Sequence, residues 1–164
     1  MSVRRVVVDN SALMPAFFPE PTSRLFDAKL VTNRALSLMQ AIRLKEVVAY
    51  VPPSFYREFL NNVAVLLNER MSVTQRLALR EDLVQHWNAL LDLPLVTIDV
   101  RDIVWRAGDL SLREDCPSAD SWYVAAAEHA KAKFWMSHRH RDGLHAIASK
   151  FVQVGLLSED SPAA

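Results

Sequence analysis

Short runs of apolar and β-branched residues recur along the chain, and each run is bounded by polar or helix-breaking residues. The clearest covers residues 6–8 and ends on Asp9, and a second at 47–51 is stopped by Pro52. Hydrophobic runs of this length without alternation are typical of strands that are buried on both faces of a sheet. We expect strands at about 3–8, 47–51, 95–98 and 134–136, with a further candidate at 151–154.

Between these runs, apolar residues repeat every three to four positions, which is the period of an amphipathic helix. Ser72 and Gln75 form a capping-box pattern before one such stretch, and Asp99 stands where another begins. The helices on either side of Ser72 are candidates for a hairpin. We expect helices at about 11–18, 23–43, 54–68, 72–90, 99–110 and 119–132, and a last one from about 144.

Strands that alternate with helices favour a parallel sheet with helices on both faces. We therefore predict an α/β protein with a three-layer α/β/α architecture around a central parallel sheet of four to five strands. The chain has 164 residues, of which 51% are hydrophobic and three are glycine. That length suits a single domain, which we place at 1–157, followed by a flexible tail at 158–164.

Charge and cysteine content narrow the functional classes. The 19 basic and 19 acidic residues give a net charge of zero, so no overall positive field attracts a polyanion, and nucleic-acid binding must be local. A single cysteine, Cys116, excludes an intrachain disulfide and suits a reducing cytoplasm. No uncharged apolar run approaches the roughly 18 residues of a membrane span, so we expect a cytoplasmic protein without membrane contact.

Three acidic residues fall near the ends of predicted strands or at the starts of adjoining helices. Asp9 follows the first strand, Glu58 lies in the helix after the second, and Asp120 begins the helix before the fourth. Because parallel strands bring their carboxyl ends to one edge of the sheet, these side chains can converge there. Carboxylates of this kind hold Mg²⁺ or Mn²⁺ and support phosphodiester hydrolysis. The alternatives are a helix cap for Asp9 and a solvated helix residue for Glu58.

The segments around these acids share a wider pattern. In this order and at these separations they resemble the motifs of the PIN-domain family, most closely the VapC-type toxin ribonucleases, over about 3–155. The segments are Val7-Val8-Asp9-Asn10-Ser11-Ala12-Leu13, Pro52 followed by Glu58 and Asn61, and Ala119-Asp120-Ser121 followed by Tyr123-Val124-Ala125-Ala126-Ala127-Glu128.

The resemblance implies a parallel sheet between helices and a metal-dependent ribonuclease that is blocked by an antitoxin. By this resemblance Asp9, Glu58 and Asp120 are the catalytic acids that bind Mg²⁺ or Mn²⁺, Ser11 is a supporting hydroxyl, and Asn61 is a supporting amide. The alternatives are a cap for Ser11 and a surface amide for Asn61. The resemblance also implies an RNA substrate, an antitoxin partner and a homodimer.

One position departs from the family pattern. Where the family usually has an aspartate two residues after a Thr or Ser, this chain has Ser137, His138 and Arg139. Asp142 is the nearest replacement acid, with a capping role as its alternative, and Arg139 and Arg141 are candidates for contact with RNA phosphates. A solvated turn is the alternative for this basic run. The missing acid keeps a second interpretation open, in which a degenerate PIN domain without nuclease activity binds RNA or protein.

Overall fold

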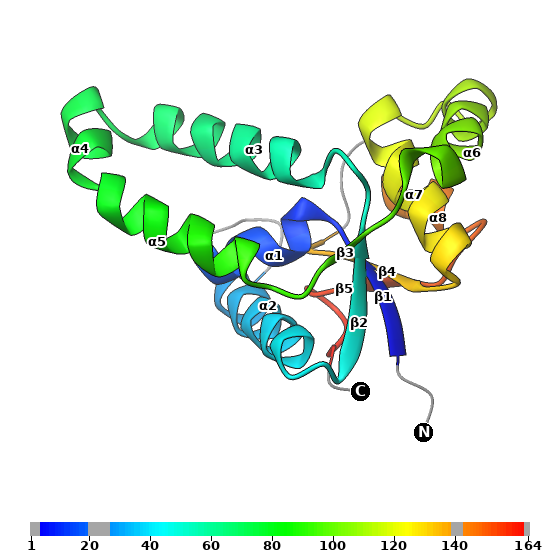
Figure 1. The fold of residues 1–164 in the computed structure, drawn as a ribbon, viewed down its shortest axis with the longest axis horizontal. Coiled ribbons are helices and arrows are strands. Elements are labelled where there is room, and N and C mark those ends of the chain that lie inside the picture. The colour runs from blue at the N-terminus through cyan, green and yellow to red at the C-terminus, as the bar shows by residue number, and fades with distance from the viewer. Residues whose placement is uncertain (1–3, 20–26, 139–142, 163–164) are drawn as a thin grey trace.

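A five-stranded, all-parallel sheet forms the centre of the molecule (Figure 1). The computed structural model describes residues 4–19, 27–138 and 143–162. Within this part of the chain the strand order is β3-β2-β1-β4-β5, so β1 is the central strand. The strands are β1 (Arg4–Val8), β2 (Val47–Val51), β3 (Val96–Thr97), β4 (Lys133–Met136) and β5 (Val154–Leu156).

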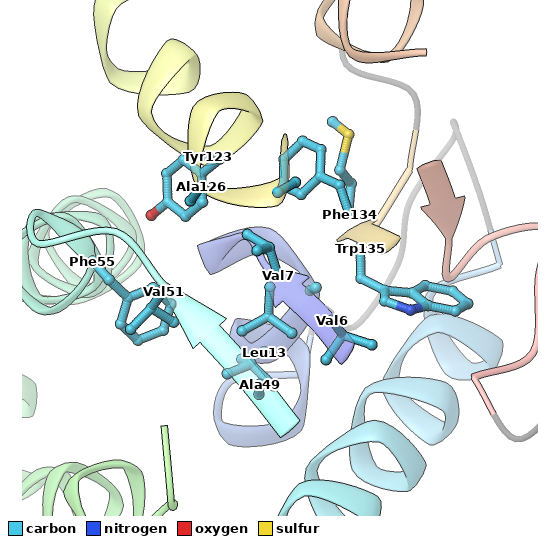
Figure 2. Packing of buried hydrophobic residues seen from close by; sticks show 14 of the residues in the cluster. Val6, Val7, Leu13, Ala49, Val51, Phe55, Tyr123, Ala126, Phe134 and Trp135 are labelled. Carbon is cyan, nitrogen blue, oxygen red and sulfur yellow. The ribbon is translucent and has the colours of Figure 1, made fainter. Parts of the chain in front are cut away.

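Helices cover both faces of the sheet, as the alternation of elements predicts. Helix α7 packs on β1, β2 and β4 and is itself covered by α6, whereas α1 and α2 pack together against the other face (Figures 1 and 2). The predicted three-layer α/β/α architecture is therefore confirmed. The helices are α1 (Asn10–Phe17), α2 (Ala28–Arg43), α3 (Phe55–Arg70), α4 (Val73–Ala78), α5 (Arg80–Leu91), α6 (Val100–Arg113), α7 (Ser118–Ala130) and α8 (Leu144–Ala148).

The three valines of β1 are buried, whereas Arg4 and Arg5 at its start are exposed. Val7 and Val8 have no exposed surface, and Figure 2 shows Val7 enclosed between residues from α7 and α1. Full burial of a valine side chain stabilises the fold by roughly 1.5–3 kcal/mol, so this short run contributes strongly to the core. On its two edges β1 pairs in parallel with β2 and β4, which fixes where the chain leaves the sheet at Asp9.

The helix expected at 23–43 begins at Ala28, because the Asp27 side chain caps it by accepting a hydrogen bond from Leu30 N (3.0 Å). Two further elements differ from their predictions. The fifth strand is Val154–Leu156 and not 151–154, because Phe151 and Val152 donate their backbone N–H groups to the Ala148 carbonyl at the end of α8. The helix expected from Ser72 to Leu90 is interrupted at Leu79, which ends α4 and begins α5. The capping box itself is confirmed, since Ser72 N donates to Gln75 Oε1 (2.8 Å) and Gln75 N to Ser72 Oγ (3.4 Å).

Helices α3, α4 and α5 form an arm that extends from the sheet (Figure 1). Helix α3 runs outward and α5 returns, and the two face each other across an apolar groove of about 450 Å³, which we call the arm groove. At its base the rings of Phe59 and Trp87 lie 6.4 Å apart. The groove is lined mainly by Phe59, Leu60, Val63, Leu67, Leu77, Leu83 and Trp87.

The segment after β5 makes contacts with the sheet. Ser158 N donates to the Ser137 carbonyl (2.8 Å), and Asp160 Oδ2 accepts from Leu156 N (3.0 Å). Ser158 and Asp160 of the expected tail thus pack near the carboxyl ends of β4 and β5, and the Pro162 carbonyl accepts a hydrogen bond from Arg4 Nη1 (3.4 Å) at the start of β1. Of the helices in the described ranges, none combines the length and the apolar content that crossing a bilayer requires.

Candidate active site

The three acids identified in the sequence line one pocket. Asp9 directly follows β1, while Glu58 and Asp120 stand in the first turns of α3 and α7. The pocket has a volume of about 520 Å³ and opens at the carboxyl edge of the parallel sheet, where α/β proteins bind ligands. Its lining residues are Asp9, Asn10, Ser11, Met14, Arg57, Glu58, Asn61, Asn62, Ala119 and Asp120.

Asp9 is held by a hydrogen bond that it donates to β4 and by one that it accepts from α1. It occupies the N-cap position of α1, yet its side chain makes no capping hydrogen bond, so the capping alternative is wrong. Instead Oδ2 accepts a hydrogen bond from Ser11 Oγ (2.6 Å), and Ser11 Oγ accepts one from Ser137 N (3.1 Å). The Asp9 N–H donates to the Trp135 carbonyl (3.0 Å) and continues the ladder between β1 and β4. Ser11 therefore orients the carboxylate.

Glu58 is fixed by two buried donors. The Tyr123 hydroxyl donates to Glu58 Oε2 (2.8 Å), and Asn10 Nδ2 donates to the Tyr123 oxygen (2.9 Å) and, at a longer 3.4 Å, to the same Oε2. Glu58 is thus a half-buried, hydrogen-bonded carboxylate and not a solvated helix residue. Asn10 is 3% exposed, and its buried Oδ1 has no hydrogen-bond partner in the part of the chain that the structure describes.

The pKa of Tyr123 reflects the negative charge of the pocket. This pKa is raised far above the ordinary range, first by burial and then by the negative charges of Asp9, Glu58 and Asp120. The phenol consequently keeps its proton and remains a hydrogen-bond donor. Three carboxylates that act on one buried group create a negative potential, and a cation in the pocket would relieve their mutual repulsion.

The oxygen atoms in the pocket are of the kind that binds a hard divalent cation, although the three carboxylates do not surround a single point. In the described residues, no group of three or more His, Cys, Asp or Glu side chains has the spacing of a metal site. The acids nevertheless share one pocket with Asn10, whose buried Oδ1 has no partner in the described ranges of the chain. Carboxylate and amide oxygens are the ligands that Mg²⁺ and Mn²⁺ accept, usually with several waters retained.

Helix α3 supplies the outer rim of the pocket. Arg57 directly precedes Glu58, and Asn61 and Asn62 follow it about one turn later; all three are exposed and line the pocket. Asn61 is therefore both a surface amide and a pocket residue. A guanidinium and two amides can donate to phosphate oxygens or base edges.

The fourth motif is only partly described. Arg139, Arg141 and Asp142 lie outside the described residues. Ser137 is buried, and its Oγ lies 2.7 Å from His138 Nδ1. His138 lines a smaller cavity of about 130 Å³ that shares Ser11 and Met14 with the acidic pocket.

Sequence reasoning missed Tyr123, Arg57 and the donor role of Asn10. The available signal was spacing, because Tyr123 follows Asp120 by three residues and so lies on the same face of α7. A tyrosine in an alanine-rich helix also needs a partner for its hydroxyl when it is buried. Nothing in the sequence, however, indicates that this partner is Glu58.

Comparison with known proteins rests on structure alone. No protein-family model and no curated protein sequence match the chain. The solved structure of FitAcB from Neisseria gonorrhoeae is similar at a TM-score of 0.59 and 17% identity, covering 94% of this chain and 99% of that one. PAE2754 from Pyrobaculum aerophilum is similar at a TM-score of 0.55 and 12% identity, covering 93% of this chain and 84% of that one.

The fold is PIN-like. The structural similarity covers nearly the whole chain. The PIN-like fold therefore includes the sheet and its flanking helices and is not confined to one supersecondary unit. In this fold the acidic pocket lies at the carboxyl edge of the sheet, where the parallel arrangement of the predicted strands places the three acids.

Proposed function

We propose that the protein is a cytoplasmic, divalent-cation-dependent endoribonuclease and the toxin of a toxin–antitoxin pair. The observation that carries this proposal is the convergence of Asp9, Glu58 and Asp120 on one pocket at the carboxyl edge of a PIN-like sheet. The resemblance of the three motifs to VapC-type toxins supports the choice of RNA as substrate.

The chain's own residues divide the work in this proposal. Asp9, Glu58 and Asp120 would hold Mg²⁺ or Mn²⁺, and Ser11 orients Asp9 through its 2.6 Å hydrogen bond. A bound cation of this type activates water and offsets the charge that develops on phosphate oxygens. Arg57 on the rim would hold the RNA backbone across the pocket, a contact that positions the strand without reading its sequence.

The test is RNA cleavage by the purified protein with Mn²⁺, with Mg²⁺ and with a chelator. Asp9→Asn keeps the shape of the side chain and removes its charge, so we expect cleavage to fall by at least about 100-fold while the circular dichroism spectrum is unchanged. Asp92→Asn is the matched control, since Asp92 is exposed at the end of α5 away from the pocket, and it should cleave like the parent. Equal activity of Asp9→Asn and Asp92→Asn would reject the assignment.

The toxin role requires an effect in cells and an antitoxin. Induced expression should stop growth for the parent and for Asp92→Asn but not for Asp9→Asn. A short neighbouring reading frame whose product binds the chain and relieves the arrest would identify the antitoxin. The homodimer implied by the resemblance remains a prediction, which light scattering of the purified chain would test.

A second function, a non-cleaving binding module, is favoured by Arg139 in the sequence. Millimolar Mn²⁺ separates the two, because a ligand that binds only the folded state raises the melting temperature. A nuclease with three acids in its pocket should melt at a higher temperature in Mn²⁺ than in chelator. An unchanged melting temperature together with retained RNA binding would support the binding module.

A further inference from the structure

The buried contact between Tyr123 and Glu58 joins two helices at the pocket. Tyr123 lies on α7, one turn beyond Asp120, and Glu58 lies on α3. The Tyr123 ring stacks on Phe134 with centroids 6.1 Å apart and is 1% exposed, so the ring cannot move away without opening the core. Figure 2 shows the hydroxyl directed away from Phe134, on the side where α3 begins. The hydroxyl is therefore a rigid donor.

Only one oxygen of Glu58 is occupied in this arrangement. Oε2 receives both described donors, the Tyr123 hydroxyl at 2.8 Å and Asn10 Nδ2 at 3.4 Å. Within the described residues, no hydrogen bond or ion pair reaches Oε1. A free glutamate samples several rotamers, and ordering it around a ligand costs conformational entropy. Here that ordering is already imposed by two donors from other helices.

We propose that Tyr123 and Asn10 are positioning residues that hold Glu58 in one orientation and present its Oε1, with the Asp9 and Asp120 carboxylates, to a divalent cation. This inference rests on the proposed function, because it assumes that the acidic pocket binds such a cation. Groups that orient metal ligands through hydrogen bonds typically contribute a factor of about 10–100 to metal affinity.

Asn10 has a second feature, at the other end of its amide. Its Nδ2 is engaged by Tyr123 and Glu58, which leaves Oδ1 buried with no hydrogen-bond partner among the described residues. Leaving a buried carbonyl oxygen unsatisfied is costly unless a ligand or water completes it. Asn10 is a pocket-lining residue, so its amide is turned to hold Glu58 at the expense of a hydrogen bond to its own Oδ1.

The test is Mn²⁺ affinity measured by isothermal titration calorimetry on the full chain. Tyr123→Phe keeps the ring and removes the hydroxyl, and we expect Mn²⁺ to bind about tenfold more weakly. Tyr50→Phe is the matched control, because Tyr50 is a half-buried residue of β2 that does not line the pocket. The Mn²⁺ affinity of this variant should stay within about twofold of that of the parent. Asn10 contacts the same carboxylate from α1, so Asn10→Ala should also weaken Mn²⁺ binding.

A double-mutant cycle separates positioning from a purely structural role. If Tyr123 acts through Glu58, then Tyr123→Phe in a Glu58→Gln background should change Mn²⁺ affinity by less than about twofold. An equal loss in both backgrounds, or a Tyr123→Phe variant that binds like Tyr50→Phe, would overturn the inference. If the parent itself binds no Mn²⁺, the proposed cation-dependent function fails first, and the inference fails with it. Should Tyr123→Phe not fold, Asn10→Ala with and without Glu58→Gln gives the same decision.

Discussion

Two faces of helix α3 do different work. One face directs Glu58, Asn61 and Asn62 into the acidic pocket, while the other directs Phe59 and Val63 into the arm groove. In the pocket, polar atoms from α1 and α7 meet Glu58 at 2.8 to 3.4 Å. In the groove, contacts are between apolar side chains and have no fixed direction. Adjacent positions 58 and 59 thus belong to separate environments.

The difference shows how one helix can carry both a site and a scaffold. Residues four apart lie on the same side of a helix, so Glu58 and Asn62 form one row and Phe59 and Val63 the next. Directional hydrogen bonds fix atoms in the first row, whereas burial of area stabilises the second. Substitutions in the two rows should therefore affect different properties, and variants that do not follow this division would break the comparison.

The largest effect should come from the base of the groove. Phe59 is 2% exposed and contacts the rings of Phe17, Phe55 and Trp87. Phe59→Ala removes this packing and should lower the free energy of unfolding by about 3–5 kcal/mol, measured by urea denaturation. The fraction that remains folded should keep the parent's cleavage rate per molecule. A comparable loss of rate at full folding would show that the two rows are coupled.

The reverse pattern should hold for the pocket. Asp120→Asn should reduce cleavage by about 100-fold, which equals about 2.7 kcal/mol of transition-state stabilisation. The urea midpoint should stay at or slightly above that of the parent, since the change removes one of three carboxylates that repel one another. Cleavage at the parent's rate would exclude Asp120 from the chemistry. A fall in the midpoint that matches that of Phe59→Ala would instead make it a structural residue.

A smaller effect should come from the rim. Arg57→Ala should weaken binding of a short single-stranded RNA by about tenfold if Arg57 contacts a phosphate. The slope of the logarithm of the binding constant against the logarithm of the salt concentration should also become shallower by about one. The measurement uses the Asp9→Asn background so that the RNA is not cut. Arg101→Ala, an exposed arginine on α6 that does not line the pocket, is the control. Equal affinity of the two variants at every salt concentration would remove Arg57 from the RNA-binding surface.

The smallest effect should come from the open side of the groove. Leu60 is 54% exposed, so Leu60→Ser should change the free energy of unfolding by less than about 0.5 kcal/mol and leave cleavage unchanged. Urea denaturation and the RNA cleavage assay measure both quantities. A loss above about 1 kcal/mol would mean that the groove is more closed in solution than its exposed leucine implies.

Most of the scaffold is predictable because its signals are local. The uninterrupted valines of β1 and the capping box at Ser72 each depend on neighbours in the sequence, and both predictions hold in the structure. The beginning of β5 was misplaced because Phe151 and Val152 have strand-forming side chains. Their N–H groups, however, are already bonded to the end of α8.

The contacts within the pocket are only partly predictable from local sequence patterns. Parallel strands place their carboxyl ends together, which is enough to bring Asp9, Glu58 and Asp120 into one pocket. The partner of the Tyr123 hydroxyl depends on how α7 is rotated over the sheet and on where α3 begins. Both follow from packing between segments 65 residues apart, and no pattern within either segment specifies them.

The central position of β1 in the sheet has a consequence for folding during synthesis on the ribosome. Residues 4–8 are made before β2 and pair with it, but their other edge must wait for β4 at residues 133–136. An apolar strand with one open edge is prone to pair with other chains, so chains that stop short of β4 should aggregate or be degraded. Asp120 and Ser137 arrive in the same late interval. A nascent chain therefore lacks the complete acidic pocket until Asp120 has been added, more than 100 residues after Asp9.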